Sequence, residues 1–233
     1  MRDGVVALRG VTKDYPLGKQ VVHALRGIDL SIAQGEFTAI AGPSGSGKTT
    51  LLNLIGCVDT PSQGSVRVDG HAVESLSDSQ RTTLRLQTLG FIFQSFNLIQ
   101  VLDVFQNVEF PLLLQRNHTA TERKNRVKEI IDAVGLSPQI RQRPNELSGG
   151  QRQRVAVARA LVTQPKIVMA DEPTANLDSA TGQTIIDLMR DLNAREKTTF
   201  IFSTHDPQVM ENASRVIHLH DGIIPEKQPG ANH

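Results

Sequence analysis

A glycine-containing segment in the first quarter of the chain has the residue types and spacing of a phosphate-binding loop. It reads Gly42-Pro43-Ser44-Gly45-Ser46-Gly47-Lys48-Thr49, the form G-x-x-x-x-G-K-[ST], and follows the apolar run 37–41. Glycines allow successive backbone N–H groups to turn toward an anion, and the N-terminus of a following helix adds positive potential. In this pattern Lys48 reaches the β- and γ-phosphates and Thr49 holds Mg²⁺. The segment therefore predicts a nucleoside triphosphate site at the start of a helix.

A second segment, Leu147-Ser148-Gly149-Gly150-Gln151, also begins a predicted helix. The Ser148 hydroxyl and the N–H groups of Gly149 and Gly150 can bind an anion at the helix N-terminus. The segment contains neither a lysine nor a Mg²⁺ ligand of its own. It is therefore predicted to supply only part of a phosphate-binding site.

A pair of carboxylates, Asp171 and Glu172, follows the apolar run 167–170 and precedes Pro173. A buried parallel strand places such residues at the C-terminal edge of a sheet, where phosphate loops also lie. We expect Asp171 to be a Mg²⁺ partner and Glu172 to be the base that polarises an attacking water. Taken alone, an Asp-Glu pair at a strand end is usually a solvated turn. The phosphate loop in the same chain favours the catalytic interpretation.

The remaining hydrophobic pattern predicts the elements that position these residues. Residues 5–11 and 21–32 are rich in β-branched and aliphatic side chains and are separated by Pro16-Leu17-Gly18, so we expect two antiparallel strands with a turn between them. Further strands are predicted over 65–69, 166–170, 198–203 and 215–219, and helices over 119–134, 149–162, 180–194 and 207–213. This alternation favours a parallel sheet flanked by helices. The tail 228–233 is predicted to be disordered.

Composition indicates one compact globular unit. The chain has 233 residues, 39% of them hydrophobic, which is enough for one large domain. Its net charge of +1 gives no broad positive field for DNA or RNA. Cys57 is the one cysteine, which excludes an internal disulfide, and we expect a small buried side chain in the helix after the phosphate loop. No run reaches the roughly 18 apolar residues that span a bilayer, and residues 1–4 contain no signal-peptide core, so a membrane role requires a partner.

In their order and spacing these motifs resemble those of ABC-type ATPases, the ATP-binding subunits of ABC transporters. The resemblance covers essentially the whole chain. It includes both glycine segments, Gln94 after a strand over 90–93, Asp171-Glu172, Asn176-Leu177-Asp178 and Ser203-Thr204-His205-Asp206. It implies an α/β fold of the P-loop NTPase class in a single ABC ATPase domain, residues 1–233. A mostly parallel core of about 1–94 and 164–233 would carry an antiparallel β subdomain and an inserted helical lobe of about 95–163.

The resemblance also implies roles for individual residues. Tyr15 would stack on adenine, although its turn-rich surroundings leave a solvated turn residue as the alternative. Gln94 would reach Mg²⁺ and the attacking water, with a plain surface residue as the alternative. His205 would hydrogen-bond the γ-phosphate and orient Glu172 rather than bond only to the backbone. The implied contacts of ATP and Mg²⁺ within one chain are Tyr15, Gly42, Pro43, Ser44, Gly45, Ser46, Gly47, Lys48, Thr49, Thr50, Gln94 and Asp171.

In this family the second glycine segment closes on the γ-phosphate bound by another subunit. The resemblance therefore implies a homodimer that sandwiches two ATP molecules head to tail, with Ser148, Gly149, Gly150 and Gln151 of each chain completing the site of the other. Asp178 would sense the neighbouring site. It could equally be the N-cap of a helix that begins at Ser179, and the two roles are compatible.

The sequence after Gln94 resembles the lipoprotein-release and macrolide-export branch of the family, in residues 91–99 and 107–112. The implied partner is an integral membrane permease with a large periplasmic domain. The implied location is the cytoplasmic face of the inner membrane, to which the permease would hold the chain as a peripheral subunit. A groove for the permease's coupling helix would be lined by Phe96, Leu98, Leu102 and Phe110. The alternative is that these residues form the core of the helical lobe, and this alternative is favoured for Phe110.

Two other function classes carry some of the same motifs. A soluble ABC-type ATPase of DNA repair or chromosome organisation separates its two halves with long coiled coils, whereas residues 94–148 contain no sustained heptads. A P-loop kinase would not need the second glycine segment. The basic run Arg152, Arg154 and Arg159 is interpreted as a solvated or interdomain helix face rather than a nucleic-acid patch, so no nucleic-acid partner is expected.

Overall fold

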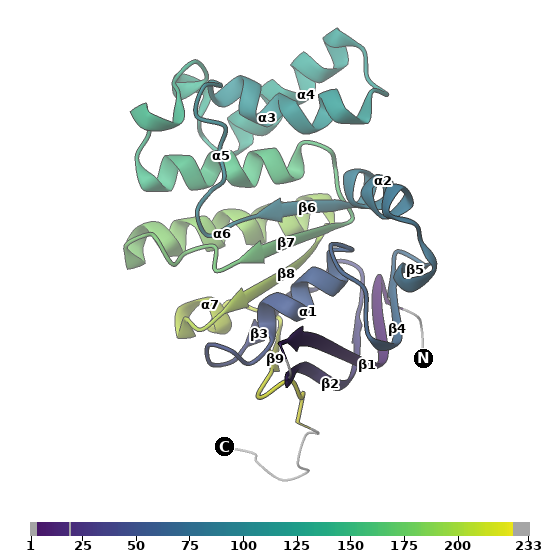
Figure 1. Ribbon diagram of the computed structural model, residues 1–233. Coiled ribbons are helices and arrows are strands. Elements are labelled where there is room, and N and C mark those ends of the chain that lie inside the picture. The colour runs from purple at the N-terminus through teal and green to yellow at the C-terminus, as the bar shows by residue number, and fades with distance from the viewer. Residues whose placement is uncertain (1–3, 19, 226–233) are drawn as a thin grey trace.

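A five-stranded parallel sheet forms the centre of the computed structural model, which describes residues 4–18 and 20–225 (Figure 1). The tail predicted to be disordered, 228–233, lies outside the described residues, as do residues 1–3. The strands are β3 (Phe37–Ala41), β6 (Leu89–Ile92), β7 (Ile167–Asp171), β8 (Thr199–Thr204) and β9 (Arg215–His218). Their order is β6-β7-β8-β3-β9, and all four neighbouring pairs are parallel. The predicted parallel sheet is confirmed, so the C-terminal ends of its strands meet at one edge.

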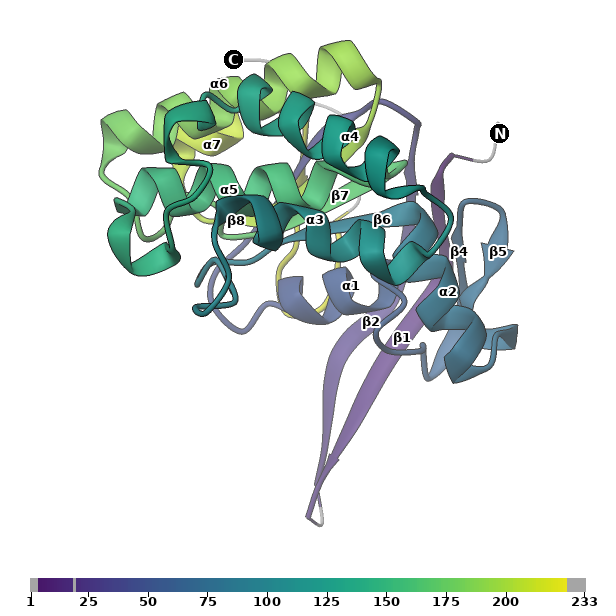
Figure 2. The same ribbon diagram turned by 90° about the horizontal axis from the view of Figure 1, so that it is seen from above.

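A four-stranded antiparallel sheet, in the order β2-β1-β4-β5, lies beside it. Its strands are β1 (Val6–Leu17), β2 (Gln20–Ile32), β4 (Gln63–Val68) and β5 (His71–Ala72). The turn expected at 16–18 is wrong in position, because β1 continues to Leu17, which pairs with Gln20. Pro16 is tolerated there because the pairing of β1 with β4 ends at Thr12, so no ladder bond to β4 is lost. Tyr15 therefore lies in a strand, in the hairpin that projects from the molecule in Figure 2.

Helices cover both faces of the parallel sheet. α1 (Lys48–Ile55) lies on one face, and α6 (Ser179–Glu196) and α7 (Pro207–Glu211) lie on the other (Figure 2). Beyond β6 gather α3 (Val104–Gln115), α4 (Ala120–Ala133) and α5 (Gly149–Leu161), while α2 (Asp78–Thr88) precedes β6 (Figure 1). Short 3₁₀ helices occupy Val73–Ser75, Ser137–Gln139 and Pro144–Glu146. The structure confirms the helices predicted over 119–134, 149–162 and 180–194, whereas α2 and α3 were not predicted.

Two apolar clusters pack against opposite faces of the parallel sheet. Phe37, Phe200 and Phe202 belong to the cluster shared with the helices α3 to α6. Ile40 and Ile201 belong to the cluster shared with α1 and the antiparallel sheet. Successive residues of a strand point to opposite faces, so β3 and β8 supply both clusters. Both strands are fully buried, as parallel strands covered on two sides must be.

Helix α3 corrects the expectation for Phe110. Its buried residues are Val104, Asn107, Val108 and Leu112. Phe110 lies on another side of the helix and has 39% of its surface exposed, so it is not part of the lobe's core. Leu98 is buried in that core instead. Within residues 4–18 and 20–225, the helices are too short or too polar to cross a bilayer.

Cys57 does not lie in the helix after the phosphate loop. α1 ends at Ile55, and Cys57 follows with a φ of 54°. Its side chain is fully buried, which confirms the expectation of a small buried residue. Burial raises the pKa of the thiol to about 11.

The arginines of α5 do not form a solvated face. Arg154 donates to a backbone carbonyl at the end of α4 at 3.0 Å. Arg159 donates to the carbonyl oxygens of Phe96 and Asn97 at 2.8 and 2.5 Å. The Arg152 guanidinium lies over the Phe96 ring, 5.2 Å from its centroid. These side chains tie α5 to neighbouring segments of the same chain.

Candidate nucleotide site

The phosphate loop joins the buried strand β3 to helix α1. Gly45 and Gly47 have φ of 80° and 101°, in the left-handed region that favours glycine. Gly47 is the N-cap of α1, which begins at Lys48 as predicted. A Cβ at Gly47 would lie 2.6 Å from the carbonyl oxygen of Ala24 in β2. The loop is therefore held tightly against β2, and its shape depends on glycine.

Polar groups converge at this loop. The Lys48 ammonium donates to the carbonyl oxygens of Gly42 and Pro43 at 2.7 and 2.9 Å, which keeps it over the loop. The Ser46 hydroxyl is buried and has no hydrogen-bond partner within the described parts of the chain. A pocket of about 490 Å³ opens here, lined by Val22 of β2 and by residues of the loop and of the first turn of α1, Thr49 and Thr50 among them. This volume is in the usual range for small-molecule sites, about 300–1,000 Å³.

The residues expected to hold Mg²⁺ lie close to one another. Thr49 and Asp171 line a common pocket of about 390 Å³ between α1 and the ends of β6 and β7. A hydroxyl and a carboxylate are the hard oxygen ligands that Mg²⁺ prefers. Together with the N–H groups of the loop and the Lys48 ammonium, they fit a magnesium–triphosphate group.

The two carboxylates lie at the sheet edge, as predicted: Asp171 is the last residue of β7, and Glu172 follows it. Asp171 pairs in register with Ser203 of β8, and the Ser203 hydroxyl donates to Asp171 Oδ1. Glu172 has a φ of 47°, a conformation that costs a residue with a side chain about 1–2 kcal/mol and that is often found at functional sites. Its N–H donates to the Ser203 carbonyl oxygen at 3.2 Å.

His205 and Glu172 are direct neighbours. His205 Nδ1 lies 2.8 Å from Glu172 Oε1. The Glu172 side chain is 17% exposed and that of His205 is 71% exposed. The histidine is thus on the solvent side of the carboxylate, where it can contact both the carboxylate and a ligand.

Gln94 lies two residues beyond the end of β6, and its side chain is exposed. The backbone carbonyl oxygen of Gln94 accepts a hydrogen bond from Asn176 Nδ2 at 2.8 Å. The preceding residue, Phe93, lines the pocket of Thr49 and Asp171. The segment with Gln94 therefore borders the expected Mg²⁺ site.

The second glycine segment begins α5, with Ser148 as the N-cap. The Ser148 hydroxyl accepts from the Gln151 N–H at 3.2 Å, and the Gln151 side chain accepts from the Ser148 N–H at 2.9 Å. A Cβ at Gly150 would lie 2.6 Å from Thr181 Cγ2, and one at Gly149 would lie 3.4 Å from Leu177 Cδ2. The segment thus packs on the loop before α6 and on α6 itself. It supplies no residue to the pocket over the phosphate loop.

Asp178 and Tyr15 each have a structural partner. Asp178 is the N-cap of α6 and accepts from the Thr181 N–H at 3.0 Å, so the predicted capping role is confirmed. Tyr15 pairs with Val22 across the hairpin. Its hydroxyl donates to Asp59 Oδ2 at 2.9 Å, so the alternative of a solvated turn residue is wrong.

Sequence reasoning missed three contributors to this arrangement. Asp59 contacts Tyr15, Ser203 contacts Asp171, and Asn176 contacts Gln94. Ser203 and Asn176 were part of recognised motifs, but their partners depend on strand order. The sequence around Asp59 carries no comparable signal.

Comparison with known proteins supports the interpretation of these motifs. Residues 25–175 match the ABC transporter family. An uncharacterised ABC transporter ATP-binding protein of Methanocaldococcus jannaschii is 42% identical over 227 residues, 96% of this chain and 97% of the relative. The lipoprotein-releasing system ATP-binding protein LolD of Anaeromyxobacter dehalogenans is 43% identical and covers 97% of this chain and 96% of its own length. The macrolide export ATP-binding/permease protein MacB 1/2 of Paracoccus denitrificans is 44% identical over 97% of this chain, which spans 34% of that protein.

A solved structure shares the fold over almost the entire chain. It is an ATP-binding cassette described as a dimeric post-hydrolysis state bound to ADP and Pi. The superposition has a TM-score of 0.87 at 43% identity and covers 95% of this chain and 97% of the other. The chain therefore belongs to the ABC transporter family, as an ATPase subunit of the branch that contains the lipoprotein-releasing and macrolide-export proteins.

Proposed function

We propose that two copies of this chain bind two Mg²⁺–ATP molecules head to tail and drive a membrane permease in export or lipoprotein release. One observation carries the proposal. The chain has a complete phosphate loop next to a Glu172–His205 pair, and it has a second anion-binding helix start that supplies nothing to the pocket over that loop. A second copy is the simplest source of the missing half of each site.

In the proposed reaction the phosphate loop and Lys48 bind the triphosphate. Thr49, Asp171 and Gln94 would hold Mg²⁺, which neutralises charge on the β- and γ-phosphates when bound. Glu172 takes the proton of the attacking water, and the 2.8 Å contact with His205 fixes the carboxylate.

The second glycine segment completes the site of the other copy. Ser148 accepts from Gln151 and can still donate its own proton, and the N–H groups at the start of α5 point out of the helix end. These donors suit the γ-phosphate. Asp178 lies in the loop against which this segment packs, so the capping residue can also respond to the neighbouring site. The related cassette described as a dimer with ADP and Pi supports this arrangement.

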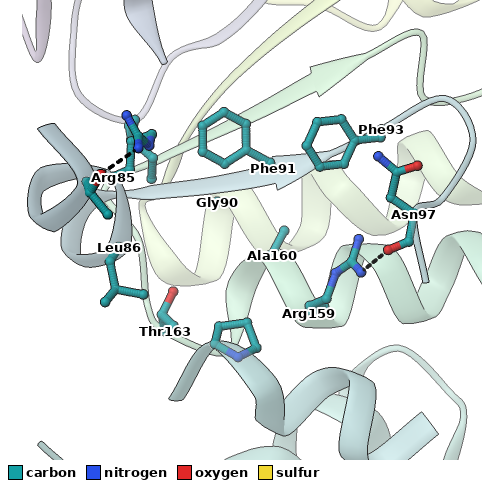
Figure 3. A pocket seen from close by; sticks show the side chains of 12 residues that line it. Arg85, Leu86, Gly90, Phe91, Phe93, Asn97, Arg159, Ala160 and Thr163 are labelled. Carbon is teal, nitrogen blue, oxygen red and sulfur yellow. Dashed lines mark hydrogen bonds between the residues drawn. The ribbon is translucent and has the colours of Figure 1, made fainter. Parts of the chain in front are cut away.

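A groove of about 340 Å³ beside α2, β6, α3 and α5 is the proposed docking site for the permease (Figure 3). Its lining includes Leu86, Phe91, Phe93, Pro111 and Arg159. The rings of Phe91 and Phe93 stack with centroids 6.0 Å apart and planes 7° apart. An amphipathic helical segment of the permease would lay its apolar side here.

This groove differs from the one expected from sequence. Phe96, Leu98 and Leu102 are not among its lining residues. Leu98 is buried because it packs into the helical lobe, and Phe96 packs partly against the same core. Docking at the groove would hold the chain at the cytoplasmic face of the membrane as a peripheral subunit, and the large periplasmic domain of the permease is part of the same proposal.

The DNA-repair class is not favoured by the structure of residues 95–148. Its two α-helices, α3 and α4, have 12 and 14 residues and pack on α5. Long coiled-coil arms would need far longer helices.

Replacing Lys48 by alanine tests the phosphate site. ATP affinity measured by calorimetry should fall below detection, because the ammonium over the loop is lost. Lys166→Ala is the matched control, since this lysine pairs with Asp69 at 2.7 Å elsewhere on the surface and its loss should not change ATP affinity. Undiminished affinity in Lys48→Ala would contradict the phosphate-loop assignment.

The permease is tested by purification of a tagged chain from native membranes. We expect an integral membrane protein to co-purify, and Phe91→Asp in the groove should abolish its recovery. Recovery of DNA without a membrane protein would favour the DNA-repair class instead.

A further inference from the structure

Three side chains around Tyr15 form one hydrogen-bonded network. The Tyr15 hydroxyl donates to Asp59 Oδ2 at 2.9 Å. Lys13 Nζ donates to Asp59 Oδ1 at 2.7 Å and to the Thr60 carbonyl oxygen at 2.8 Å. The same ammonium lies over the Tyr15 ring, 5.0 Å from its centroid. Lys13 and Tyr15 come from β1, whereas Asp59 comes from the segment after α1.

Asp59 is itself fixed relative to α1. The backbone N–H groups of Val58 and Asp59 both donate to the Asn53 carbonyl oxygen, at 2.9 and 3.2 Å. Asp59 Oδ1 also accepts from the Thr60 N–H at 2.7 Å. Because α1 begins in the phosphate loop, the network links Tyr15 to the element that positions the phosphates.

Two groups of the network have shifted pKa values. Burial acts to raise the pKa of Asp59, but hydrogen bonds from Lys13, Thr60 and Tyr15 bring it below its ordinary value, so the carboxylate is ionised near neutral pH. Burial and Asp59 raise the pKa of the Tyr15 hydroxyl, against a smaller opposite effect of Thr50, so Tyr15 keeps its proton. The Lys13 and Asp59 side chains are only 12% and 30% exposed, which strengthens their ion pair relative to a fully solvated one.

Tyr15 is close to the pocket over the phosphate loop. Its cross-strand partner Val22 lines that pocket, and directly paired residues of antiparallel strands point to the same face of a sheet. Thr50, which interacts with the Tyr15 hydroxyl, lines the pocket too. The Lys13 ammonium takes up one face of the ring, so a planar base would stack on the other face.

We propose that Lys13 and Asp59 are positioning residues that hold the Tyr15 ring at a fixed place relative to the phosphate loop, where it receives the adenine base. This inference rests on the nucleotide site proposed above. It predicts that the network affects binding of the base and leaves binding of the phosphates alone. It also predicts that the effect falls on KM for ATP rather than on kcat, because Glu172 and His205 lie at a different part of the site.

The test compares ATP with inorganic tripolyphosphate, which has no base, in calorimetry on the full chain. Asp59→Asn and Tyr15→Phe should each weaken ATP binding by about 2- to 12-fold, the range expected for losing one hydrogen bond of about 0.5–1.5 kcal/mol. Tripolyphosphate affinity should stay the same in both. The double variant should bind ATP no more weakly than the weaker single variant, because the two changes remove one interaction. Lys13→Met should reproduce the effect of Asp59→Asn if that variant proves unstable in thermal melting.

Other results would overturn the inference. Equal weakening of ATP and tripolyphosphate would show a general loss of the loop's structure, and additive effects of Asp59→Asn and Tyr15→Phe would show that Asp59 does not act through the Tyr15 hydroxyl. ATP affinity unchanged in folded Asp59→Asn would also contradict it. Failure of the nucleotide site itself is distinguished by Lys48→Ala, which should abolish binding of both probes.

Discussion

Replacing Gly150 by alanine tests whether the second glycine segment depends on its close packing against α6. A Cβ at this position would lie 2.6 Å from Thr181 Cγ2, which is 0.8 Å closer than the 3.4 Å of an ordinary contact (3.4 − 2.6). Over-packing of this kind costs about 1–3 kcal/mol. Alanine offsets about 1 kcal/mol of this cost through its higher helix propensity. The net destabilisation should therefore be about 0–2 kcal/mol, a fall in Tm of up to about 8 °C.

The larger effect should be on function. The first turn of α5 must move by several tenths of an ångström to relieve the overlap, and this turn carries the proposed donors to the partner's γ-phosphate. Misplacement of a binding group by about 1 Å can lower a rate on the order of 100-fold. We expect Gly150→Ala to lower kcat by about 10- to 100-fold and to reduce ATP-dependent dimerisation in size-exclusion chromatography. ATP affinity of the single subunit should not change.

Two further variants test whether the contact of Gly150 with Thr181 causes these effects. Thr181→Ser removes Cγ2 but keeps the N–H that donates to Asp178, so the double variant with Gly150→Ala should recover kcat. Gly149→Ala should lower Tm less than Gly150→Ala does, because its Cβ would lie 3.4 Å from Leu177 Cδ2. If Thr181→Ser fails to restore kcat, or if Gly149→Ala lowers Tm as much as Gly150→Ala does, the clash with α6 is not the cause.

The remaining predictions concern the base, the helical lobe and the buried thiol. Glu172→Gln should lower kcat about 10²- to 10⁴-fold. In size-exclusion chromatography with ATP this variant should elute at twice the 25.5 kDa of one chain. Elution as a monomer alone would contradict the head-to-tail dimer. Asn107→Leu should lower the free energy of unfolding by roughly 3 kcal/mol in urea titration, because this buried side chain makes three hydrogen bonds to part-buried backbone groups of Ile99 and Leu102. A loss under about 1 kcal/mol would contradict this. Cys57 has a pKa of about 11 against an ordinary 9.0, so the native protein should have about 100-fold less thiolate at pH 8 and should react with iodoacetamide only after unfolding. Rapid labelling of the native protein would be evidence against the buried position.

Local signals in the sequence located the phosphate loop and the strand before the carboxylates, because each is a continuous segment. Helix α3 was missed for a physical reason. It carries exposed Phe110, Leu113 and Leu114 opposite its buried side. Its hydrophobic residues therefore do not recur with the period of an amphipathic helix. Helix α2 was missed for the opposite reason, since only Leu84 and Thr88 are buried along its length. Its capping box, Ser77 with Gln80, was present in the sequence as a start signal.

The contacts of the site depend on tertiary structure. Ser203 reaches Asp171 only because β8 lies next to β7, and the two residues are 32 positions apart. Tyr15 reaches Asp59 across 44 positions, and only because β1 continues beyond residue 11, where the predicted strand ended. Residue types predicted which groups would do chemistry. Which of these groups contact one another depends on the order of the strands in the sheet.

Strain is stored where the proposed docking groove meets α5. Phe96 and Asn97 have φ of 62° and 47°, and each left-handed residue with a side chain costs about 1–2 kcal/mol. Both carbonyl oxygens accept from Arg159, and Figure 3 shows this arginine and Asn97 together at the groove. The conformation of this segment therefore depends on α5.

Helix α5 in turn connects the proposed docking groove to the second glycine segment. Ser148 caps its start and Arg159 lies near its other end, and a helix of 13 residues is about 20 Å long. Between them Gln153 is fully buried and donates to the Pro173 carbonyl oxygen at 2.7 Å, directly after Glu172. A packed helix moves as a body, since its contacts cannot deform continuously. A permease segment that shifts Arg159 would therefore move the donors that are proposed to bind the partner's ATP, without touching either nucleotide.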